Sequence, residues 1–478
     1  MPCFFVYLPA EECYPPCWWV LRIYGGFAMN KEMKQQLKSI PLKHYAHFDG
    51  RISMKTAWDY VTNPQKIIQH HFYPFICYDK DYTKYNKNKG VKSKKRKLCY
   101  SAHIDRCIYQ YYACLLNEIY NQRTSDDGIV EVAVAYRNNL KKNNIHFAKQ
   151  AIDFIRNQKS CYIFVGDFTN FFDSLNHKYL KKQICSLLTC EELPDDYYAV
   201  FKNITQYSEW NLSDLLLLNK MENTIKGRRS LNQKETILTL RQFKDNKHQF
   251  LSPGKKRSKG IPQGSAISAV LANVYMLEFD KQVNDYVKSQ SGLYMRYSDD
   301  FIIVLPMGND KVFQKQYDFI CQFINAIPDL QLESKKTQIF EYTTNVLHNC
   351  NDKFIINGEK GKDFLDYLGF TFDGKTVTVR DKTLSKYYYR MYRKLETIIQ
   401  NRGVSSNGNK ISCKRLYLGY SERGAKIDKS TQEMDNKHSG NFLTYINRAK
   451  KVFSGNENIE RGTKRHMQKI RKKLKALK

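Results

Sequence analysis

Two adjacent acids, Asp299 and Asp300, interrupt an apolar run of β-branched and aromatic residues, YMRYSDDFIIV (294–304). Apolar residues on both sides of a short polar break predict a tight β-hairpin with the acids at its tip. Two carboxylates side by side raise each other's pKa, so a positive charge should compensate for them. Bound metal ions are the best candidates for that charge.

A third acid, Asp167, ends the run YIFVGD (162–167), which predicts a buried strand. A carboxylate at a strand end beside an acidic hairpin tip can help to hold two divalent cations about 3.5–4 Å apart. Magnesium suits such a site because it prefers carboxylate and phosphate oxygens. An acidic pair taken alone is more often an exposed turn, so the metal interpretation depends on these three acids lying together.

The charge balance favours a polyanionic partner. The chain has 78 Lys+Arg against 47 Asp+Glu, a net charge of +31, which is typical of proteins that bind nucleic acid. A basic surface that only keeps the protein soluble is the alternative. The 34 tyrosines include residues that could stack on bases, although most should lie in the core.

Cysteine usage and hydropathy restrict the class of protein further. The 13 cysteines contain no CxxC pair and no Cys/His cluster at zinc spacing, which argues against a structural zinc. Their odd number and irregular spacing argue against a disulfide framework and for a reducing cytoplasm. No run of about 18 apolar residues predicts a transmembrane helix. We therefore expect a cytoplasmic protein without a membrane partner.

Residues 1–39 are interpreted as an N-terminal extension. The segment has no basic start, carries Glu11 and Glu12 early, and makes a poor signal peptide. Translation beginning at Met29 or Met33 is the alternative to a natively translated extension.

Local patterns predict most of the remaining elements. A helix is expected over 105–122 and another over 311–326, with short strands in QLESKKTQIF and DFLDYLGFTFDGKTVTV. The lysine-dense segment KDYTKYNKNKGVKSKKRK (80–97) is expected to be a loop. The glycine-punctuated segment 252–267 should lead into a long apolar helix.

The tail from about residue 380 predicts two amphipathic basic helices. In the first, 385–400, one face carries Lys386, Arg390, Arg393 and Lys394, and another face is apolar. In the second, 460–478, the residues Met467, Ile470, Leu474 and Leu477 form a narrow apolar stripe. Ordinary solvated faces would look similar singly, but two such helices in one tail favour a subdomain that grips a nucleic-acid duplex.

Six segments in collinear order resemble the successive motifs of reverse transcriptases. They span residues 80–375 and are KRKLCYSAHIDRCIY (95–109), GDFTNFFDSLNH (166–177), GIPQGSAISAVLANVYM (260–276), YSDD (297–300), the Lys336-Thr337 pair and DYLGF (366–370). Within the family the chain looks most like the prokaryotic enzymes, and among those like the defence-associated (retron-related, "unknown group") reverse transcriptases.

The resemblance implies an α+β right-hand polymerase fold with fingers, an antiparallel palm sheet with helices, and a helical thumb. It divides the chain into fingers at 40–160, a palm at 161–375 with a fingers insertion near 190–255, and a basic thumb at 376–478. We find no endonuclease or RNase H motif, and the tail is too short for a maturase extension, so we expect a stand-alone polymerase.

The same resemblance implies roles for individual residues. Asp167, Asp299 and Asp300 match the catalytic, metal-binding carboxylates, and the backbone carbonyl of Phe168 matches a further metal ligand. Phe172 matches the ring that excludes a sugar 2′-hydroxyl, although without the resemblance it would be interpreted as a core residue. The residues expected to contact the dNTP are Arg96, Lys97, Phe172, Gln263 and Lys336, and those expected to contact nucleic acid are Gly264, Lys386, Arg390, Arg393 and Lys394.

Several of these roles have structural alternatives. The register within KKRK leaves the assignment of Arg96 and Lys97 open, and Lys336 could be a solvated surface lysine rather than the proton donor to pyrophosphate. Ser298 stands where other members often have Ala, Met or Val, and its small size should be tolerated.

The resulting hypothesis is an RNA-directed DNA polymerase that uses two Mg²⁺ ions, with Mn²⁺ as a substitute. It would make cDNA from an RNA template, a dedicated non-coding RNA, in bacterial antiviral defence. Homopolymer synthesis without a template is the alternative in the same class, and a catalytically silent RNA-binding scaffold is the alternative in another. The sequence leaves the priming group and a homo-oligomeric state open.

Overall fold

The structure is a computed structural model, and it describes residues 29–86, 90–254, 257–355, 358–402, 404, 414–425, 440–453 and 458–475. The chain divides into two compact units. The first comprises the described parts of Met1–Val130, Thr169–Lys281 and Ile324–Gln331, and the second those of Glu131–Phe168, Gln282–Phe323 and Leu332–Lys478. Within the described residues, none of the helices combines the length and apolarity that crossing a membrane requires. Residues 1–28, most of the proposed N-terminal extension, lie outside the description.

The second unit is built on a five-stranded sheet with strand order β6-β7-β3-β8-β9. All neighbouring strands are antiparallel. The strands are β3 (Ser160–Asp167), β6 (Leu293–Tyr297), β7 (Asp300–Pro306), β8 (Gln338–Thr343) and β9 (Val346–Asn349). The hairpin predicted at 294–304 is therefore confirmed as β6–β7, and the strand predicted before Asp167 is confirmed as β3.

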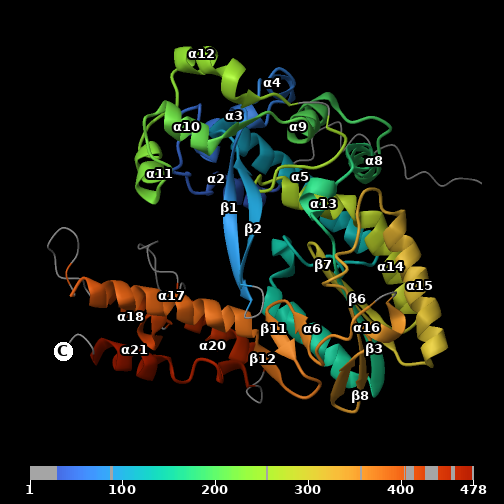
Figure 1. The fold of residues 1–478 in the computed structure, drawn as a ribbon. Helices are drawn as coiled ribbons and strands as arrows, with labels where there is room; N and C mark the ends of the chain where they lie inside the picture. Colours follow the sequence, from blue (N-terminus) through green and yellow to red (C-terminus); the bar gives the residue numbers. More distant parts are fainter. Residues whose placement is uncertain are drawn as a thin grey trace, which may run out of the picture. The chain divides into compact units, whose positions relative to one another are not determined.

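Helices cover the two faces of this sheet (Figure 1). On one face, α6 (Asn144–Asn157) packs its apolar side against alternate residues of β3, β7 and β8 in one hydrophobic core. On the other face, α15 (Asp310–Ala326) stacks Phe313 on Tyr162 of β3 with ring centroids 4.1 Å apart. Burial on both faces explains why β3 and β7 read as almost continuous apolar runs.

Apart from η1, the remaining elements of the second unit follow the five-stranded sheet in sequence. A small antiparallel sheet has the strand order β10-β11-β12, and its apolar residues join the core beside α6. The helix predicted over 385–400 is confirmed as α17, and its buried residues Met391, Leu395 and Ile398 pack against Ile470 of α21. The elements are η1 (Asn138–Leu140), α16 (Asn351–Phe354), β10 (Leu365–Tyr367), β11 (Phe370–Phe372), β12 (Val377–Val379), α17 (Asp381–Gln400), α18 (Lys414–Tyr420), α19 (Glu422–Ala425), α20 (Phe442–Val452), η3 (Asn458–Glu460) and α21 (His466–Leu474).

The first unit is mainly helical, with one four-stranded sheet of order β2-β1-β4-β5. Trp210 and Ile76 lie in its core with leucines of α10. Its elements are α2 (Lys31–Lys38), α3 (Met54–Val61), α4 (Pro64–Ile68), β1 (Phe75–Asn86), β2 (Gly90–Tyr100), α5 (His103–Asp126), α7 (Phe171–Ser174), α8 (His177–Leu188), α9 (Asp195–Thr205), β4 (Glu209–Asn211), α10 (Leu212–Leu218), α11 (Ile225–Leu231), α12 (Leu240–Phe250), β5 (Leu251–Ser252) and α13 (Ser268–Tyr275). The helix α14 (Leu277–Ser289) begins in this unit and continues into the second.

The prediction of a loop over 80–97 was wrong. Residues 80–86 and 90–97 belong to a long antiparallel ribbon, in which β1 and β2 pair from Ile76 opposite Tyr100 to Asn86 opposite Gly90. Lysines and tyrosines occur without a consistent apolar face, so no two-residue periodicity marked the strands. The two strands are instead held together by backbone pairing along their whole length.

The same pairing places Cys77 opposite Cys99, and the two residues form a disulfide. One bridge is not the framework that the cysteine pattern argued against. The sequence did not predict this bridge. Two cysteines 22 residues apart can form a disulfide only if the fold brings them together, and here the strand register does so. The division into fingers, palm and thumb by residue range stays a prediction.

Candidate active site

Strand pairing brings the predicted acids to one edge of the five-stranded sheet. Asp167, the last residue of β3, lies directly opposite Asp300, the first residue of β7. Asp299 occupies the turn between β6 and β7 together with Ser298, which adopts a left-handed backbone conformation with φ 64°. The backbone N–H of Phe168 donates to the carbonyl oxygen of Asp299 at 3.2 Å, so the turn is fastened to the end of β3.

Two basic side chains of the protein itself compensate for this negative charge. The Lys336 ammonium forms a short ion pair with the carboxylate of Asp167. Arg296 is fully buried beneath the turn, and its guanidinium donates to the carbonyl oxygen of Ser298 at 2.8 Å. The expectation that bound metal alone would offset the acids is therefore incomplete.

The pKa of Asp300 is raised to about 7. Loss of hydration is the largest cause, followed by the negative charges of Asp299 and Asp167, while Lys336 acts in the opposite direction. The Asp300 side chain is exposed in part, which weakens the effect of lost hydration. The two neighbouring carboxylates also raise the pKa, so the upward direction does not depend on burial alone. In its neutral form Asp300 shares a hydrogen bond with Asp167. Protonation of Asp300 would lower the negative charge of the site.

The donor set suits divalent cations held between carboxylates. Oxygen ligands of this kind are those that Mg²⁺ prefers. Among the residues described, the group of His, Cys, Asp or Glu ligand atoms that all lie within 4.8 Å of one another is Cys77, Cys99 and Glu209, not the three aspartates. The two cysteine sulfurs of that group are bonded to each other.

A second cluster of predicted residues forms within the first unit. The backbone carbonyl of Gln263 accepts from the N–H of Cys99 at 2.9 Å, and the carbonyl of Phe172 accepts from the N–H of Ile261 at 2.9 Å. Gly264 has φ +123°, and a Cβ there would lie 2.3 Å from the carbonyl oxygen of Cys99. Only glycine allows this loop to approach the end of β2 so closely.

The two predicted basic residues of β2 differ in their surroundings. Lys97 donates to Glu209 of β4 at 2.6 Å, whereas the guanidinium of Arg96 lies over the Tyr82 ring at 5.5 Å from its centroid. Both side chains are exposed. An incoming phosphate would have to compete with Glu209 for Lys97, so the geometry favours Arg96 as the more available cation.

The predicted basic stripe of α17 faces away from its core. Lys386, Arg390 and Arg393 are exposed and Lys394 is half-buried, while Tyr387, Met391, Leu395 and Ile398 are buried. This arrangement agrees with an amphipathic helix that presents cations to a polyanion. Contacts of these residues with nucleic acid stay a prediction.

Comparison with known proteins identifies the family. The family model described as reverse transcriptase (RNA-dependent DNA polymerase) matches residues 85–372, more than half of the chain. The chain belongs to the reverse transcriptase family. Membership confirms the α+β right-hand polymerase fold that the motifs predicted.

Individual relatives of this reverse transcriptase are distant. The telomerase reverse transcriptase of Euplotes aediculatus is 24% identical over 135 residues, which cover 26% of this chain and 13% of that protein. A solved apo telomerase of Candida tropicalis, truncated from its C-terminal domain, has a TM-score of 0.38 and 13% identity, with 69% of this chain and 61% of that chain covered. A Candida albicans telomerase in complex with a fragment of telomeric RNA has a TM-score of 0.37, 12% identity and coverages of 88% and 66%. TM-scores this low support no further argument.

Three residues of this reverse transcriptase escaped the sequence reasoning. Arg296 donates to the backbone of the turn between β6 and β7, and the exposed Tyr136 places its hydroxyl 3.1 Å from that of Ser298 in the same turn. Glu209 binds Lys97 and also lies 3.5 Å from Arg257. A charged residue inside the apolar strand YMRY was the only one of these signals visible in the sequence.

Proposed function

We propose that this protein is an RNA-directed DNA polymerase that adds deoxynucleotides to a 3′-hydroxyl on an RNA template. The observation that carries the proposal is the register of β3 and β7, which sets Asp167 opposite Asp300 with Asp299 in the adjoining turn. Family membership supports the same chemistry.

Two divalent ions, Mg²⁺ with Mn²⁺ as a substitute, would be held by Asp167, Asp299, Asp300 and the backbone carbonyl of Phe168. When bound, such ions activate the attacking hydroxyl and neutralise the departing pyrophosphate. The chain's own contribution is to position the carboxylates on a rigid sheet edge and to keep a cation, Lys336, beside them. We expect Lys336 to leave Asp167 when metal binds and to become available to the pyrophosphate.

Further residues are expected to contact the nucleotide and the nucleic acid. Phe172 is expected to exclude ribonucleotides, because a ring beneath C2′ leaves no room for another oxygen. Gln263 and Gly264 should contact the base pair, and Arg96 and Lys97 the triphosphate. The exposed cations of α17 should contact the phosphates of the duplex.

The biological setting that we propose is bacterial antiviral defence in the cytoplasm, with a dedicated non-coding RNA as template. The resemblance of the motifs to defence-associated reverse transcriptases supports this setting. The high net charge of +31 supports a nucleic-acid partner of some kind.

The test compares Asp299→Asn with the wild type in primer extension, beside Asp352→Asn as a matched control. Asp352 is an exposed acid of α16 in the same unit. Asp299→Asn should abolish nucleotide addition and leave RNA binding nearly intact, and Asp352→Asn should change neither. Synthesis that persists in Asp299→Asn would remove these acids from the mechanism.

Sequencing the nucleic acids that co-purify with the wild type and with Asp299→Asn addresses the template. DNA complementary to a bound RNA, and present only with the wild type, would support the proposal. Repetitive DNA that matches no RNA would indicate homopolymer synthesis, and RNA without any acid-dependent DNA would indicate a scaffold.

A further inference from the structure

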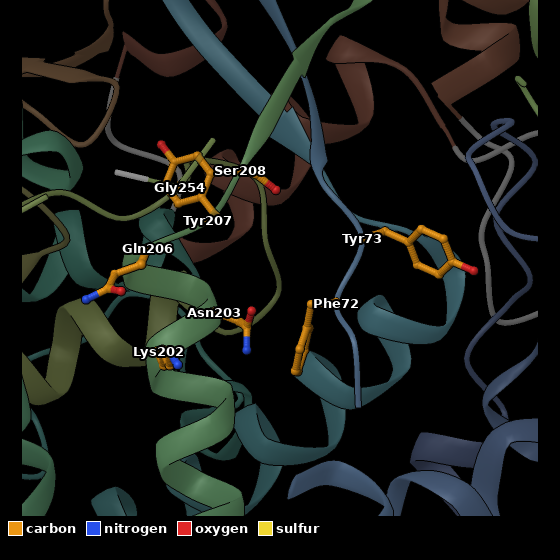
Figure 2. Close-up of a pocket in the computed structure, with 8 residues that line it drawn as sticks. All are labelled: Phe72, Tyr73, Lys202, Asn203, Gln206, Tyr207, Ser208 and Gly254. Atoms are coloured by element: carbon orange, nitrogen blue, oxygen red, sulfur yellow. The ribbon is translucent and has the colours of Figure 1, made fainter. Parts of the chain in front are cut away.

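The first unit contains a cavity of about 210 Å³ that no catalytic role explains. Its lining comes from three segments, namely the residues before β1, the C-terminal end of α9 with the residues that follow it, and the loop after β5 (Figure 2). These lining residues are Phe72, Tyr73, Lys202, Asn203, Gln206, Tyr207, Ser208 and Gly254. The volume is smaller than that of drug-sized pockets and suits a single planar ring system.

One wall of the cavity is the half-buried ring of Phe72. In Figure 2 this ring faces the side chain of Asn203 across the opening. The Phe72 ring also contacts the ring of His70, with centroids 4.6 Å apart, and the ring of Tyr109, with centroids 5.4 Å apart. An aromatic ring held by its neighbours is the usual platform for stacking an unpaired base.

The opposite side offers hydrogen-bonding groups. The Asn203 amide donates one N–H to the backbone carbonyl of Ala199 at 2.8 Å, which fixes its orientation. An amide has a second N–H and an acceptor oxygen, the pair of groups that can bind the edge of a base. The hydroxyl of Ser208 adds another donor and acceptor at the rim (Figure 2).

The backbone around the cavity is fixed before any ligand arrives. The N–H of Phe75 donates to the carbonyl of Ser208 at 2.8 Å, and the N–H of Tyr73 donates to the buried carboxylate of Asp105 at 2.9 Å. Gly254 completes the floor, because a Cβ there would lie 1.9 Å from the carbonyl oxygen of Gln206. A preformed cavity loses little entropy when it binds a ligand.

Two cations lie at or beside the cavity. Lys202 lines it with an exposed side chain. The Arg257 guanidinium, which also pairs with Glu209, lies 4.1 Å from the ring centroid of the lining residue Tyr207. Arg257 belongs to the basic segment GKKRSK (254–259) that begins at the cavity floor. Aromatic, amide and cationic groups together match the chemistry of a single nucleotide of RNA.

We propose that this cavity binds one unstacked nucleobase of a single-stranded RNA and so anchors that RNA on the first unit. The inference rests on the proposed RNA partner, but not on polymerase activity. It adds a contact that reads a base, rather than the phosphate backbone, outside the catalytic centre.

The test measures the affinity of fluorescein-labelled 12-nucleotide RNAs (oligo-rU, oligo-rA and oligo-rC) by anisotropy, without dNTPs or divalent ions. The variants are Phe72→Leu, which keeps an apolar side chain without the flat ring, and Asn203→Leu. Tyr198→Leu is the matched control, because Tyr198 is a 45% exposed aromatic residue of the same helix, α9, and does not line the cavity. Unchanged melting profiles confirm that each variant is folded.

We expect Phe72→Leu to weaken binding by about fivefold or more, the lower end for loss of one base–aromatic stack, with Tyr198→Leu unchanged. The slope of log affinity against log salt should stay as in the wild type, because no phosphate contact is lost. Lys202→Gln should instead reduce that slope by about one. Asn203→Leu should alter the preference among the three homopolymers.

A 12-nucleotide RNA carrying 5-iodouridine should photo-crosslink to the peptide with Phe72 or the peptide with Tyr207. Wild-type affinity in Phe72→Leu, or crosslinks confined to other peptides, would overturn the proposal. If free mononucleotides added before irradiation prevent the crosslink while the 12-nucleotide RNA stays bound, the cavity binds free nucleotides and not a base of the strand, which would overturn the proposal. If Asp299→Asn loses polymerisation but keeps its RNA affinity, RNA binding at the cavity and nucleotide addition at the acids can be judged separately.

Discussion

The glycine before Asp167, a proposed catalytic residue, should resist substitution for a steric reason. Gly166 of β3 pairs with Phe301 of β7, one position from the pair formed by Asp167 and Asp300. A Cβ on Gly166 would lie 2.3 and 2.5 Å from two ring carbons of Phe301, closer than the 3.0 Å that real Cβ contacts respect. Phe301 is fully buried and also contacts the rings of Phe164 and Phe168, so it has little room to retreat.

Gly166→Ala should therefore lower the free energy of unfolding by about 1–3 kcal/mol, the usual cost of one extra carbon in a packed core. The strain acts on β3 and β7 at the positions next to the carboxylates. Because a displacement of about 1 Å of reacting groups can cost about a hundredfold in rate, nucleotide addition should fall by about tenfold to a hundredfold.

The assay combines chemical denaturation with primer extension for Gly166→Ala, Phe301→Leu and the double variant. Gly50→Ala serves as the control, because a Cβ at Gly50 meets nothing within 4 Å. Leucine at 301 removes the ring atoms that the new Cβ would touch, so the double variant should be more stable and more active than Gly166→Ala alone. If Gly166→Ala matches the wild type, or if Phe301→Leu fails to relieve it, the steric reasoning is refuted.

Three further predictions concern other parts of the chain. Phe172→Ala should admit ribonucleotides, and an unchanged dNTP preference in competition assays would show that the ring does not contact the sugar. Burial, and to a lesser extent His103, lower the pKa of His47 from 6.5 to about 3. The stability that the neutral His47 gives to the folded protein is therefore fully present above pH 6.5 and is lost as the pH falls below that value. Denaturation should show a loss on the order of 2 kcal/mol between pH 8 and pH 5, and His47→Leu should flatten that difference if the assignment is right. Reduction of the Cys77–Cys99 disulfide should lower the free energy of unfolding by about 2–4 kcal/mol, and a Cys77→Ser variant that still responds to reductant would contradict this origin.

Sequence patterns predicted the elements whose signals are local. The hairpin of β6 and β7, the strand before Asp167, and the helices α5, α15 and α17 all have apolar residues at the spacing of their own secondary structure. The local patterns of β3 and β7 do not show which strands pair with each other. Only the family resemblance implied an antiparallel sheet that contains both. Features that depend on long-range register were missed for the same reason, among them the ribbon of β1 and β2 and the capture of Lys97 by Glu209.

The adjacent acids of the hairpin show how missing long-range contacts change a conclusion about charge compensation. From the sequence, bound metal ions were the best candidates for the positive charge that offsets a like-charged pair in an apolar run. The structure supplies Lys336 beside Asp167, the buried Arg296 beneath the turn, and a proton on Asp300 whose pKa is near neutrality. If divalent ions bind Asp167 as proposed, they would compete with the Lys336 ammonium for the same carboxylate. A displaced Lys336 would then be available to contact a phosphate.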